Sequence, residues 1–176
     1  MDSKNKDFIV YTCITGAYEK KNYGHVLDKS IKYICFSDDE SFVPKGWEFR
    51  PIKGLESFNY KDTNRYIKMH PHKYFSQYKM SIYIDYNILI KSNLKNLFLN
   101  TQKSQGIVFM YDHPYRKCSY EEIIKVVSTG LAPFNKGMKQ YNKYKNIYFP
   151  GNLGLFEANI IIRKHNKKES SKLMEY

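Results

Sequence analysis

The chain has 176 residues and a mass of 21.0 kDa, which is the size of one domain whose core needs no disulfide or structural metal. Hydrophobic residues make up 42% and charged residues 26%, a balance that excludes wholesale disorder. The formal net charge of +12 favours anionic partners such as nucleotides, nucleic acid or acidic membrane surfaces, without choosing among them. We therefore expect a single domain over residues 1–176.

The cysteines and the amino terminus indicate a compartment. Cys13, Cys35 and Cys118 are widely spaced and form no C-x-x-C pair, so the sequence predicts neither a disulfide framework nor a zinc site. The charged first residues lead into an apolar stretch too short for a signal peptide or a transmembrane helix. We expect a cytoplasmic protein and leave open a peripheral contact with the inner face of the membrane; no pattern indicates an oligomeric state.

Apolar stretches rich in β-branched and aromatic residues predict β-strands. In chain order they are residues 8–14, 31–36, 47–52, 80–84, 106–111 and 155–163, with a short extended piece at 88–90. Capping residues between them predict helices. The expected helices begin at Asp62 (broken by Pro71), at Ser92, at a capping box of Ser119 and Glu122 before residues 120–129, at Pro133, and at Asn166. Strands interleaved with helices predict an α/β sandwich with a mostly parallel sheet.

Polar residues follow three of these strands. Thr15 and Gly16 come after the first, Asp38 and Asp39 after the second, and Asp85-Tyr86-Asn87 after the strand 80–84. Ligands of α/β sheets bind at the carboxyl ends of strands. The oxygens of Asp85 and Asn87 suit a hard divalent cation, Mg²⁺ or Mn²⁺, which attracts a diphosphate; an ordinary turn is the alternative. The pattern points towards nucleotide-sugar chemistry.

Two basic residues precede that strand. Arg65 and Lys68 lie three positions apart on the helix before Pro71, so they share a face. If this face points towards the diphosphate, both cations stabilise the charge that grows on a departing nucleotide. The alternative is a solvated helical face, and the sequence favours neither reading.

Six segments, taken in order, resemble the glycosyltransferase-like family formerly labelled domain of unknown function 616, which includes bacterial capsule-cluster proteins. The segments are Val10–Tyr18, Tyr33–Asp39, Arg65–Tyr74, Ile82–Ile88, His113–Glu122 and Gly154–Arg163. The similarity spans roughly residues 9–166, and the ordered set is far more specific than any single motif.

The resemblance implies a single-domain GT-A-like (Rossmann-like) α/β/α sandwich with a mostly parallel, mixed sheet. It implies a nucleotide sugar, most simply a UDP-sugar, as donor, a glycan as acceptor, and Mn²⁺ or Mg²⁺ as cofactor. Asp85 and Asn87 would lie at the metal and the diphosphate. The residues expected beside the nucleobase and ribose are Thr12, Thr15, Gly16, Tyr18, Asp38 and Asp39.

A second constellation lies at the junction of the fifth strand and the next helix, on the expected acceptor side. Arg116 beside His113 could bind a carboxylate or a phosphate of the acceptor. Glu122 is expected to serve the capping box, which leaves Glu121 as the freer candidate for a catalytic base.

Further candidates lie near the last strand. Asn152, Gly154 and Glu157 resemble a segment that lines the sugar and the acceptor in many GT-A enzymes, and Gln140 is a weaker candidate from the preceding helix. Glu157 is either a base or sugar contact, or an acid that points to solvent. We favour a surface role for His165 over a late metal ligand.

The sequence therefore predicts a metal-assisted glycosyltransferase that builds a cell-surface polysaccharide or its precursor. Members of the family usually continue past the helix expected near Asn166, so the fold is a firmer expectation than activity. A catalytically inactive GT-A-like scaffold is the main alternative. A nucleic-acid-binding module, suggested by the charge and by Gly151–Gly154 as a GXXG loop, is disfavoured because this loop precedes a strand.

Overall fold

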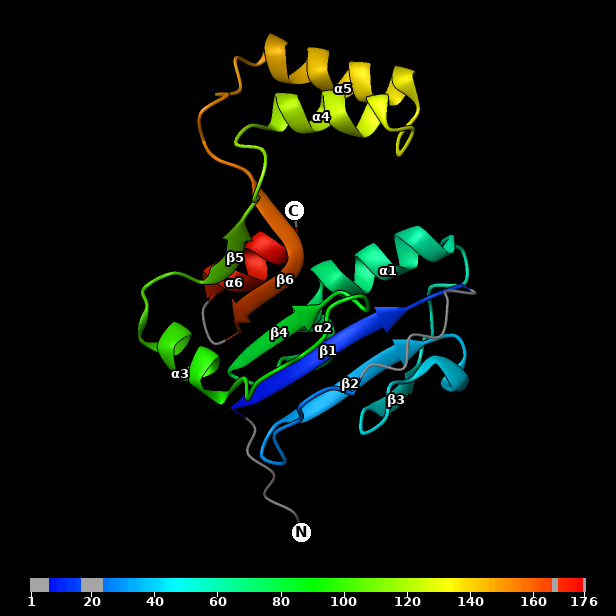
Figure 1. The fold of residues 1–176 in the computed structure, drawn as a ribbon, viewed down its shortest axis with the longest axis vertical. Helices are drawn as coiled ribbons and strands as arrows, with labels where there is room; N and C mark the ends of the chain where they lie inside the picture. Colours follow the sequence, from blue (N-terminus) through cyan, green and yellow to red (C-terminus); the bar gives the residue numbers. More distant parts are fainter. Residues whose placement is uncertain (1–6, 17–23, 166–167, 176) are drawn as a thin grey trace. The chain divides into compact units, whose positions relative to one another are not determined.

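The computed structural model describes residues 7–16, 24–165 and 168–175. Across these ranges, six strands form one sheet in the order β3-β2-β1-β4-β6-β5 (Figure 1). Their bounds are β1 Phe8–Ile14, β2 Lys32–Ser37, β3 Glu48–Pro51, β4 Met80–Ile84, β5 Val108–Asp112 and β6 Phe156–Lys164. Each predicted strand is present within a few residues of its expected bounds, and the piece at 88–90 is not a strand.

The sheet is mixed and mostly parallel, as predicted. β1 pairs in parallel with β2 on one side and with β4 on the other, and β2 pairs in parallel with β3. β6 runs antiparallel to β4, with Ile82 opposite Ile162. Connections between parallel strands must cross over a face of the sheet, and the connection from β3 to β4 contains the helical residues 60–69 and 71–75.

The helices of the described residues are α1 Tyr60–Met69, α2 Pro71–Phe75, α3 Lys95–Lys103, α4 Ser119–Ser128, α5 Phe134–Asn146 and α6 Lys168–Met174, with a 3-10 turn η1 at Glu40–Phe42. Pro71 separates α1 from α2, because proline cannot continue a helix but is accepted in a first turn. No helix among the described residues has the length and apolar character needed to cross a bilayer.

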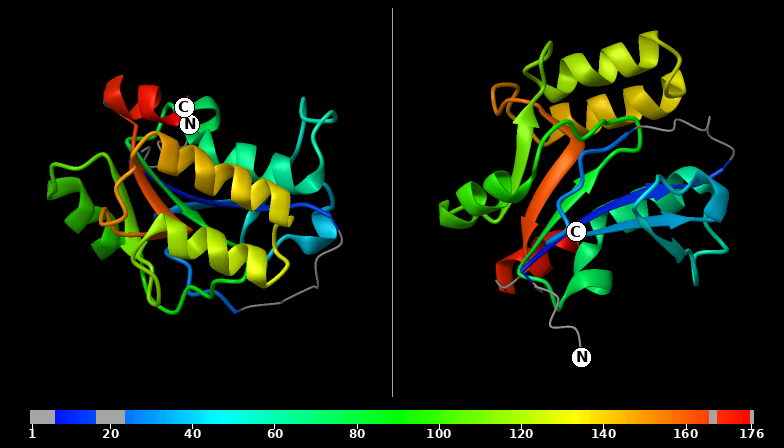
Figure 2. Two further views of the ribbon diagram at one scale, coloured as in Figure 1. Left: turned by 90° about the horizontal axis from the view of Figure 1, so that it is seen from above. Right: turned by 60° about the horizontal axis from the view of Figure 1, so that its bottom comes forward.

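Two apolar clusters bury both faces of the sheet. Alternate residues of β1 supply them: Val10 belongs to one cluster, and Ile9 and Tyr11 to the other. Phe98 of α3 packs into the first cluster, and Ile67 of α1 packs into the second. β1 is therefore a continuous run of buried residues, as expected of a parallel strand covered on both faces. Its place inside the sheet, between β2 and β4, can be followed in Figure 2.

Contacts divide the chain into two compact units. Unit 1 is Met1–Phe109 with Asn159–Tyr176, and unit 2 is Met110–Ala158. Unit 2 consists of the antiparallel α4–α5 pair and the outer parts of β5 and β6, since both of these strands run through both units. The expectation of one domain stays a prediction.

Some helix starts differ from the predicted ones. α1 is capped by Asn59, whose side chain accepts a hydrogen bond from the Asp62 amide, so Asp62 lies inside the first turn. α3 begins at Lys95 rather than at Ser92, and Asn93 accepts the Lys95 amide. The cap predicted at Asn166 lies outside the described residues.

Candidate functional site

The sheet order creates a topological switch point between β1 and β4. From β1 the chain passes to β2 and β3 on one side, and β4 lies on the other side of β1. In open α/β sheets, ligands bind outside the carboxyl ends of two such strands. Thr15 and Gly16 follow β1 and Asp85 follows β4, so three predicted residues lie at this end of the sheet.

The turn after β1 needs its glycine. Gly16 has a φ of +73°, and an added Cβ would lie 3.0 Å from the Tyr60 ring. The Thr15 hydroxyl donates to the Tyr60 carbonyl oxygen at 2.8 Å, which ties this turn to the start of α1. The Gly16 amide donates to Asp38 Oδ2 at 2.9 Å. The ends of β1 and β2 are therefore joined by an acid that was predicted to lie there.

The two acids after β2 have different contacts. Asp38 accepts the Gly16 amide, whereas Asp39 caps η1 by accepting the Ser41 amide at 2.7 Å. Both residues are exposed. Asp38 therefore lies beside the turn after β1, whereas Asp39 caps the local turn η1.

Asp85 forms an ion pair with Lys68. The Lys68 Nζ lies 3.0 Å from Asp85 Oδ1, and the lysine side chain is only 15% exposed whereas that of the aspartate is 34% exposed. Lys68 also lies over the Tyr83 ring, 4.7 Å from its centroid. Because α1 delivers Lys68 to the end of β4, a cation and an acid adjoin the switch point.

Partly buried hydrogen bonds hold α1 against this end of the sheet. Asn64 donates to the Cys13 carbonyl oxygen at 2.6 Å and accepts from the Tyr83 hydroxyl at 3.4 Å. Burial, then the charge of Asp85, raises the pKa of Tyr83 well above its usual value, so this hydroxyl stays protonated and donates. The sequence analysis missed Asn64, although its position four residues before Lys68 places it on the same helical face.

Arg163 is a second residue that the sequence analysis missed. Its side chain is 2% exposed, and it donates to the Tyr11 hydroxyl at 3.3 Å. The Tyr11 hydroxyl donates in turn to the Lys68 carbonyl oxygen at 2.9 Å. Burial lowers the pKa of Arg163, and a cation near the last turn of α1 suits the negative end of the helix dipole. This chain of contacts fixes the backbone of Lys68.

Asp85 and Asn87, after β4, offer two oxygen ligands to a divalent cation whose remaining ligands would be substrate phosphates and water. Asp85 and Asn87 belong to one turn, closed by the Ile88 amide donating to the Asp85 carbonyl oxygen at 2.9 Å, and Asn87 is exposed. Within the described ranges no group of three or more His, Cys, Asp or Glu side chains could hold a metal. Mg²⁺ commonly takes one or two protein carboxylates and completes its shell with substrate phosphates and water. Asp85 and Asn87 fit that pattern, and Lys68 competes for Asp85.

Other predicted donor contacts lie elsewhere. Arg65 pairs with Asp62 at 3.7 Å on the exposed side of α1, and its side chain is 63% exposed, so its observed partner differs from that of Lys68. Thr12 is 2% exposed inside β1, and its hydroxyl has no hydrogen-bond partner in the described part of the chain. Tyr18 lies outside the described residues.

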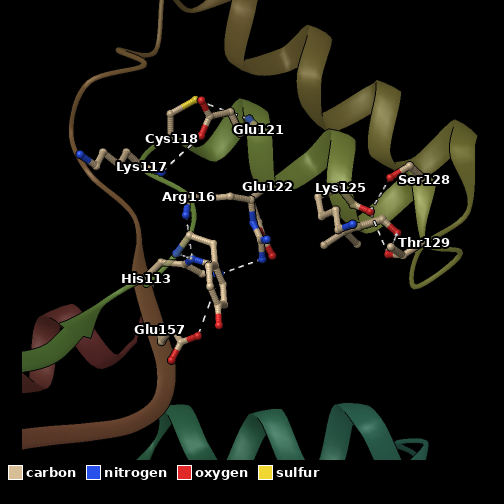
Figure 3. Close-up of polar contacts among 12 residues, drawn as sticks. His113, Arg116, Lys117, Cys118, Glu121, Glu122, Lys125, Ser128, Thr129 and Glu157 are labelled. Atoms are coloured by element: carbon tan, nitrogen blue, oxygen red, sulfur yellow. Dashed lines mark hydrogen bonds and ion pairs between the residues drawn. The ribbon is translucent and has the colours of Figure 1, made fainter.

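In unit 2, the predicted acceptor-side residues form a polar cluster (Figure 3). Arg116 pairs through Nε with Glu122, and its NH2 lies 2.7 Å from His113 Nε2. The same ring nitrogen lies 4.0 Å from Glu157 Oε1. Arg116 and His113 therefore lie next to each other, with Glu122 beside the first and Glu157 beside the second.

The contacts of His113 compete for its ring nitrogens. Its Nδ1 accepts the backbone amides of Tyr115 at 3.1 Å and of Arg116 at 3.0 Å. The Arg116 guanidinium can only donate, so its NH2, which lies 2.7 Å from Nε2, needs an acceptor there as well. A neutral imidazole accepts at only one nitrogen, so these contacts do not fix one tautomer. The guanidinium remains a donor that suits an anionic oxygen of a ligand.

Glu121, and not Glu122, lies at the cap of α4. The N-cap of α4 is Cys118, whose Sγ lies 3.5 Å from the Glu121 amide, and Ser119 is the first helical residue. Glu121 accordingly occupies the third helical position and accepts the Lys117 amide at 3.3 Å. The predicted capping box of Ser119 and Glu122 is therefore wrong by one residue, and Glu122 is the acid that binds Arg116.

A cavity of about 320 Å³ lies within unit 2, between α4 and α5. Glu122, Gln140, Lys136 and Leu155 are among its lining residues. Gln140, the weaker candidate, therefore shares this cavity with Glu122, the acid that pairs with Arg116. The Gln140 side chain donates to the Tyr144 hydroxyl at 2.9 Å. Asn152 and Gly154 are exposed in the loop before β6, where Gly154 has a φ of +80°.

His165 is held by two hydrogen-bonding groups rather than lying free on the surface. Its Nε2 lies 2.8 Å from Ser81 Oγ, and its Nδ1 lies 3.0 Å from the Phe75 carbonyl oxygen. Burial lowers the pKa of this imidazole to about 4. The surface role that we favoured is therefore wrong, and the residue fastens α2 to the sheet.

No protein-family model and no curated protein sequence matches the chain. Among solved structures, the crystal structure of mouse xyloside xylosyltransferase 1 in its apo form is similar, with a TM-score of 0.53 and 10% sequence identity. The similarity covers 96% of this chain and 70% of that chain. It confirms the predicted glycosyltransferase-like, Rossmann-like fold; membership of the family formerly labelled domain of unknown function 616 stays a prediction.

Proposed function

We propose that the chain is a glycosyltransferase that transfers a sugar from a nucleotide sugar, most simply a UDP-sugar, to a cell-surface polysaccharide or its precursor. One observation carries the proposal: in a glycosyltransferase-like fold, Asp85 and Lys68 adjoin the switch point between β1 and β4. Motif similarity to the capsule-associated family formerly labelled domain of unknown function 616 agrees with it. We place the reaction in the cytoplasm.

In the proposed donor site, some residues would neutralise the charge of the diphosphate and others would position the nucleotide. Lys68 binds an oxygen of the diphosphate and stabilises the negative charge that grows as the nucleotide departs. Asp85 and Asn87 would hold Mn²⁺ or Mg²⁺, which supplies further charge neutralisation when bound. Asp38, fastened to the Gly16 amide, lies beside the turn after β1, where the ribose would bind. In unit 2, Arg116, His113 and Glu157 form a polar cluster that would bind an anionic or hydroxyl group of the acceptor.

Thermal unfolding with nucleoside diphosphates and UDP-sugars, with and without Mn²⁺, tests the donor site. A ligand present at about 100 times its Kd should raise Tm by roughly 5–10 °C. Asp85→Asn should abolish the Mn²⁺-dependent part of the shift, whereas the matched change Asp112→Asn, at an exposed acid at the end of β5, should keep it. A wild-type protein with no shift for any nucleotide would contradict the proposal.

A catalytically inactive nucleotide-sugar-binding scaffold is the second candidate. It is favoured by Asn87, a neutral amide that attracts a dication less strongly than a carboxylate does, and by the ion pair of Asp85 with Lys68. Release of UDP from a bound UDP-sugar separates the two. If the chain is an enzyme, the wild type should release UDP faster than the Asp85→Asn variant does. If the wild type binds the UDP-sugar but releases UDP no faster than the variant, the scaffold is supported.

A further inference from the structure

The carboxyl end of α5 carries an aromatic residue in a conformation that favours glycine. Tyr148 has a φ of +53° and is 90% exposed. Its amide donates to the Lys145 carbonyl oxygen at 3.0 Å, and the Phe149 amide donates to that of Tyr144 at 2.9 Å. These two bonds form a Schellman motif, in which the left-handed position is usually glycine.

Tyr148 contributes little to the turn that contains it. The apolar contact that accompanies a Schellman motif is made by Phe149, whose ring stacks on that of Tyr144 with centroids 4.8 Å apart. Tyr148 projects into solvent instead, although a non-glycine residue is disfavoured at this φ. A strained residue that the fold does not require is a reason to look for a function.

A basic stripe leads along α5 to this tyrosine. Lys136, Lys139, Lys143 and Ile147 follow at intervals of three, four and four residues, which place them on one face of a helix. Ile147 is 59% exposed, and its amide donates to the Lys143 carbonyl oxygen at 3.2 Å, so the helical spacing extends to it. Lys145 lies elsewhere, over the rings of Tyr120 and Tyr141.

The segment that carries this face has charge of one sign. Residues 123–156 contain five lysines and no aspartate or glutamate; the lysines are Lys125, Lys136, Lys139, Lys143 and Lys145. Glu122, just before this segment, lines the same cavity as Lys136, so the acid nearest to the stripe lies at its amino-terminal lysine. Leu153, in the loop that follows α5, adds a further apolar side chain that is 59% exposed.

We propose that the α5 face, defined as Lys136, Lys139, Lys143, Ile147 and Tyr148, binds the surface of an anionic phospholipid bilayer. Lysines near an anionic leaflet are attracted to its headgroups, and tyrosine is enriched at the interface between headgroups and acyl chains. An exposed isoleucine beside them finds an apolar medium in the bilayer. Nucleic acid would use the lysines and leave Ile147 in water, so a bilayer accounts for more of the face. This inference goes beyond the proposed function and does not depend on it.

Vesicle co-sedimentation tests the inference on the whole chain. We expect binding to vesicles that contain phosphatidylglycerol, and little binding to phosphatidylcholine alone. Each lysine near the surface contributes about fivefold in affinity, so Lys139→Gln with Lys143→Gln should weaken binding about 30-fold. The matched control, Lys91→Gln with Lys103→Gln, removes the same charge at exposed positions of unit 1 and should bind within about twofold of the wild type.

Tyr148→Gly separates binding from folding. Glycine suits the left-handed position, so Tm should stay the same or rise, whereas vesicle binding should weaken severalfold. Undiminished vesicle binding by Tyr148→Gly would overturn the inference, as would equal affinity for neutral and anionic vesicles. The inference would also be overturned if the wild type bound no vesicles. It would be overturned as well if the double lysine variant lost oligonucleotide binding while its vesicle binding was unchanged.

Discussion

Lys68 and Asp85 neutralise each other at the proposed donor site. An ion pair that is partly exposed contributes on the order of 1 kcal/mol to stability. A diphosphate and a cation can therefore replace the contact between Lys68 and Asp85 at a modest cost in free energy. The lysine would turn to phosphate and the aspartate to metal. The protein alone should therefore bind Mn²⁺ weakly, and nucleotide should strengthen that binding.

Asn87→Asp tests whether the turn after β4 is a metal ligand set. A carboxylate attracts a dication more strongly than an amide does, so Mn²⁺ affinity should rise about tenfold. Titration calorimetry with and without UDP measures the change. Asn135→Asp, which adds the same charge at an exposed position of α5, is the control. Equal Mn²⁺ affinities for Asn87→Asp and the wild type would leave residues 85–88 as an ordinary turn.

Gly16→Ala should destabilise the turn after β1. The new Cβ meets the Tyr60 ring at 3.0 Å, and alanine disfavours a φ of +73°. A loss of about 1–2 kcal/mol in the free energy of unfolding is expected from urea titration. Gly24→Ala, where a Cβ has no neighbour within 4 Å, should change stability little. If Gly16→Ala and Gly24→Ala lower the free energy of unfolding by the same amount, the turn after β1 is less constrained than its contacts imply.

At the scale of elements, the α4–α5 pair depends on one glycine. A Cβ on Gly137 would lie 2.1 Å from Val127 Cγ2, so the two helices approach too closely at this point for any other residue. Mid-helix glycine is otherwise unfavourable by about 1 kcal/mol relative to alanine, which indicates that close packing outweighs helix propensity here. Arg116, Glu122 and Gln140 all lie on or beside this pair.

Gly137→Ala should therefore destabilise unit 2 despite the better helix propensity of alanine. Adding Val127→Ala removes the clashing methyl groups and should restore most of the loss. Hydrogen exchange of the amides of α4 and α5 measures both variants. Rescue absent in the double variant would show that the glycine is needed for a reason other than contact with Val127.

Strand patterns were predicted more accurately than helix starts, and the reason is physical. β1 is buried on both faces, so its apolar run marks both of its ends, Phe8 and Ile14. The start of a helix depends on which single side chain caps it, and adjacent residues can often serve as the cap. Cys118, a weak acceptor, caps α4 where the sequence favoured Ser119, and this shift by one residue exchanged the contacts of Glu121 and Glu122.

The candidate site was predictable where a residue follows a strand. Asp38 and Asp85 lie at strand ends, so pattern and chain order were sufficient to place them. The Lys68–Asp85 pair was not specified, because it depends on how α1 packs against β4. Arg163 was missed for a similar reason: a buried cation inside an apolar strand shows its purpose only when Tyr11 is seen beside it.

At the scale of the whole molecule, stability should fall on acidification. Burial lowers the pKa of His165 from 6.5 to about 4, so the unfolded chain binds a proton more readily than the folded one. The stabilisation is complete above about pH 6.5 and is lost as the pH falls towards 4. Urea unfolding should show a loss of about 2 kcal/mol between pH 7.5 and pH 5 from this residue.

His165→Gln isolates that contribution. The variant should be less stable than the wild type near neutral pH and should lose less stability on acidification, because glutamine does not titrate. Equal slopes of stability against pH in the two proteins would assign the acid sensitivity to other groups, such as His25, whose pKa burial also lowers.

The most direct test of the central claim is hydrogen exchange of the whole chain with and without UDP and Mn²⁺. We expect slower exchange at the carboxyl ends of β1, β2 and β4, in peptides that cover residues 14–16, 37–39 and 85–88, and at Lys68 of α1. Saturating nucleotide that binds but leaves these segments unchanged, or protects only residues 123–156, would contradict it.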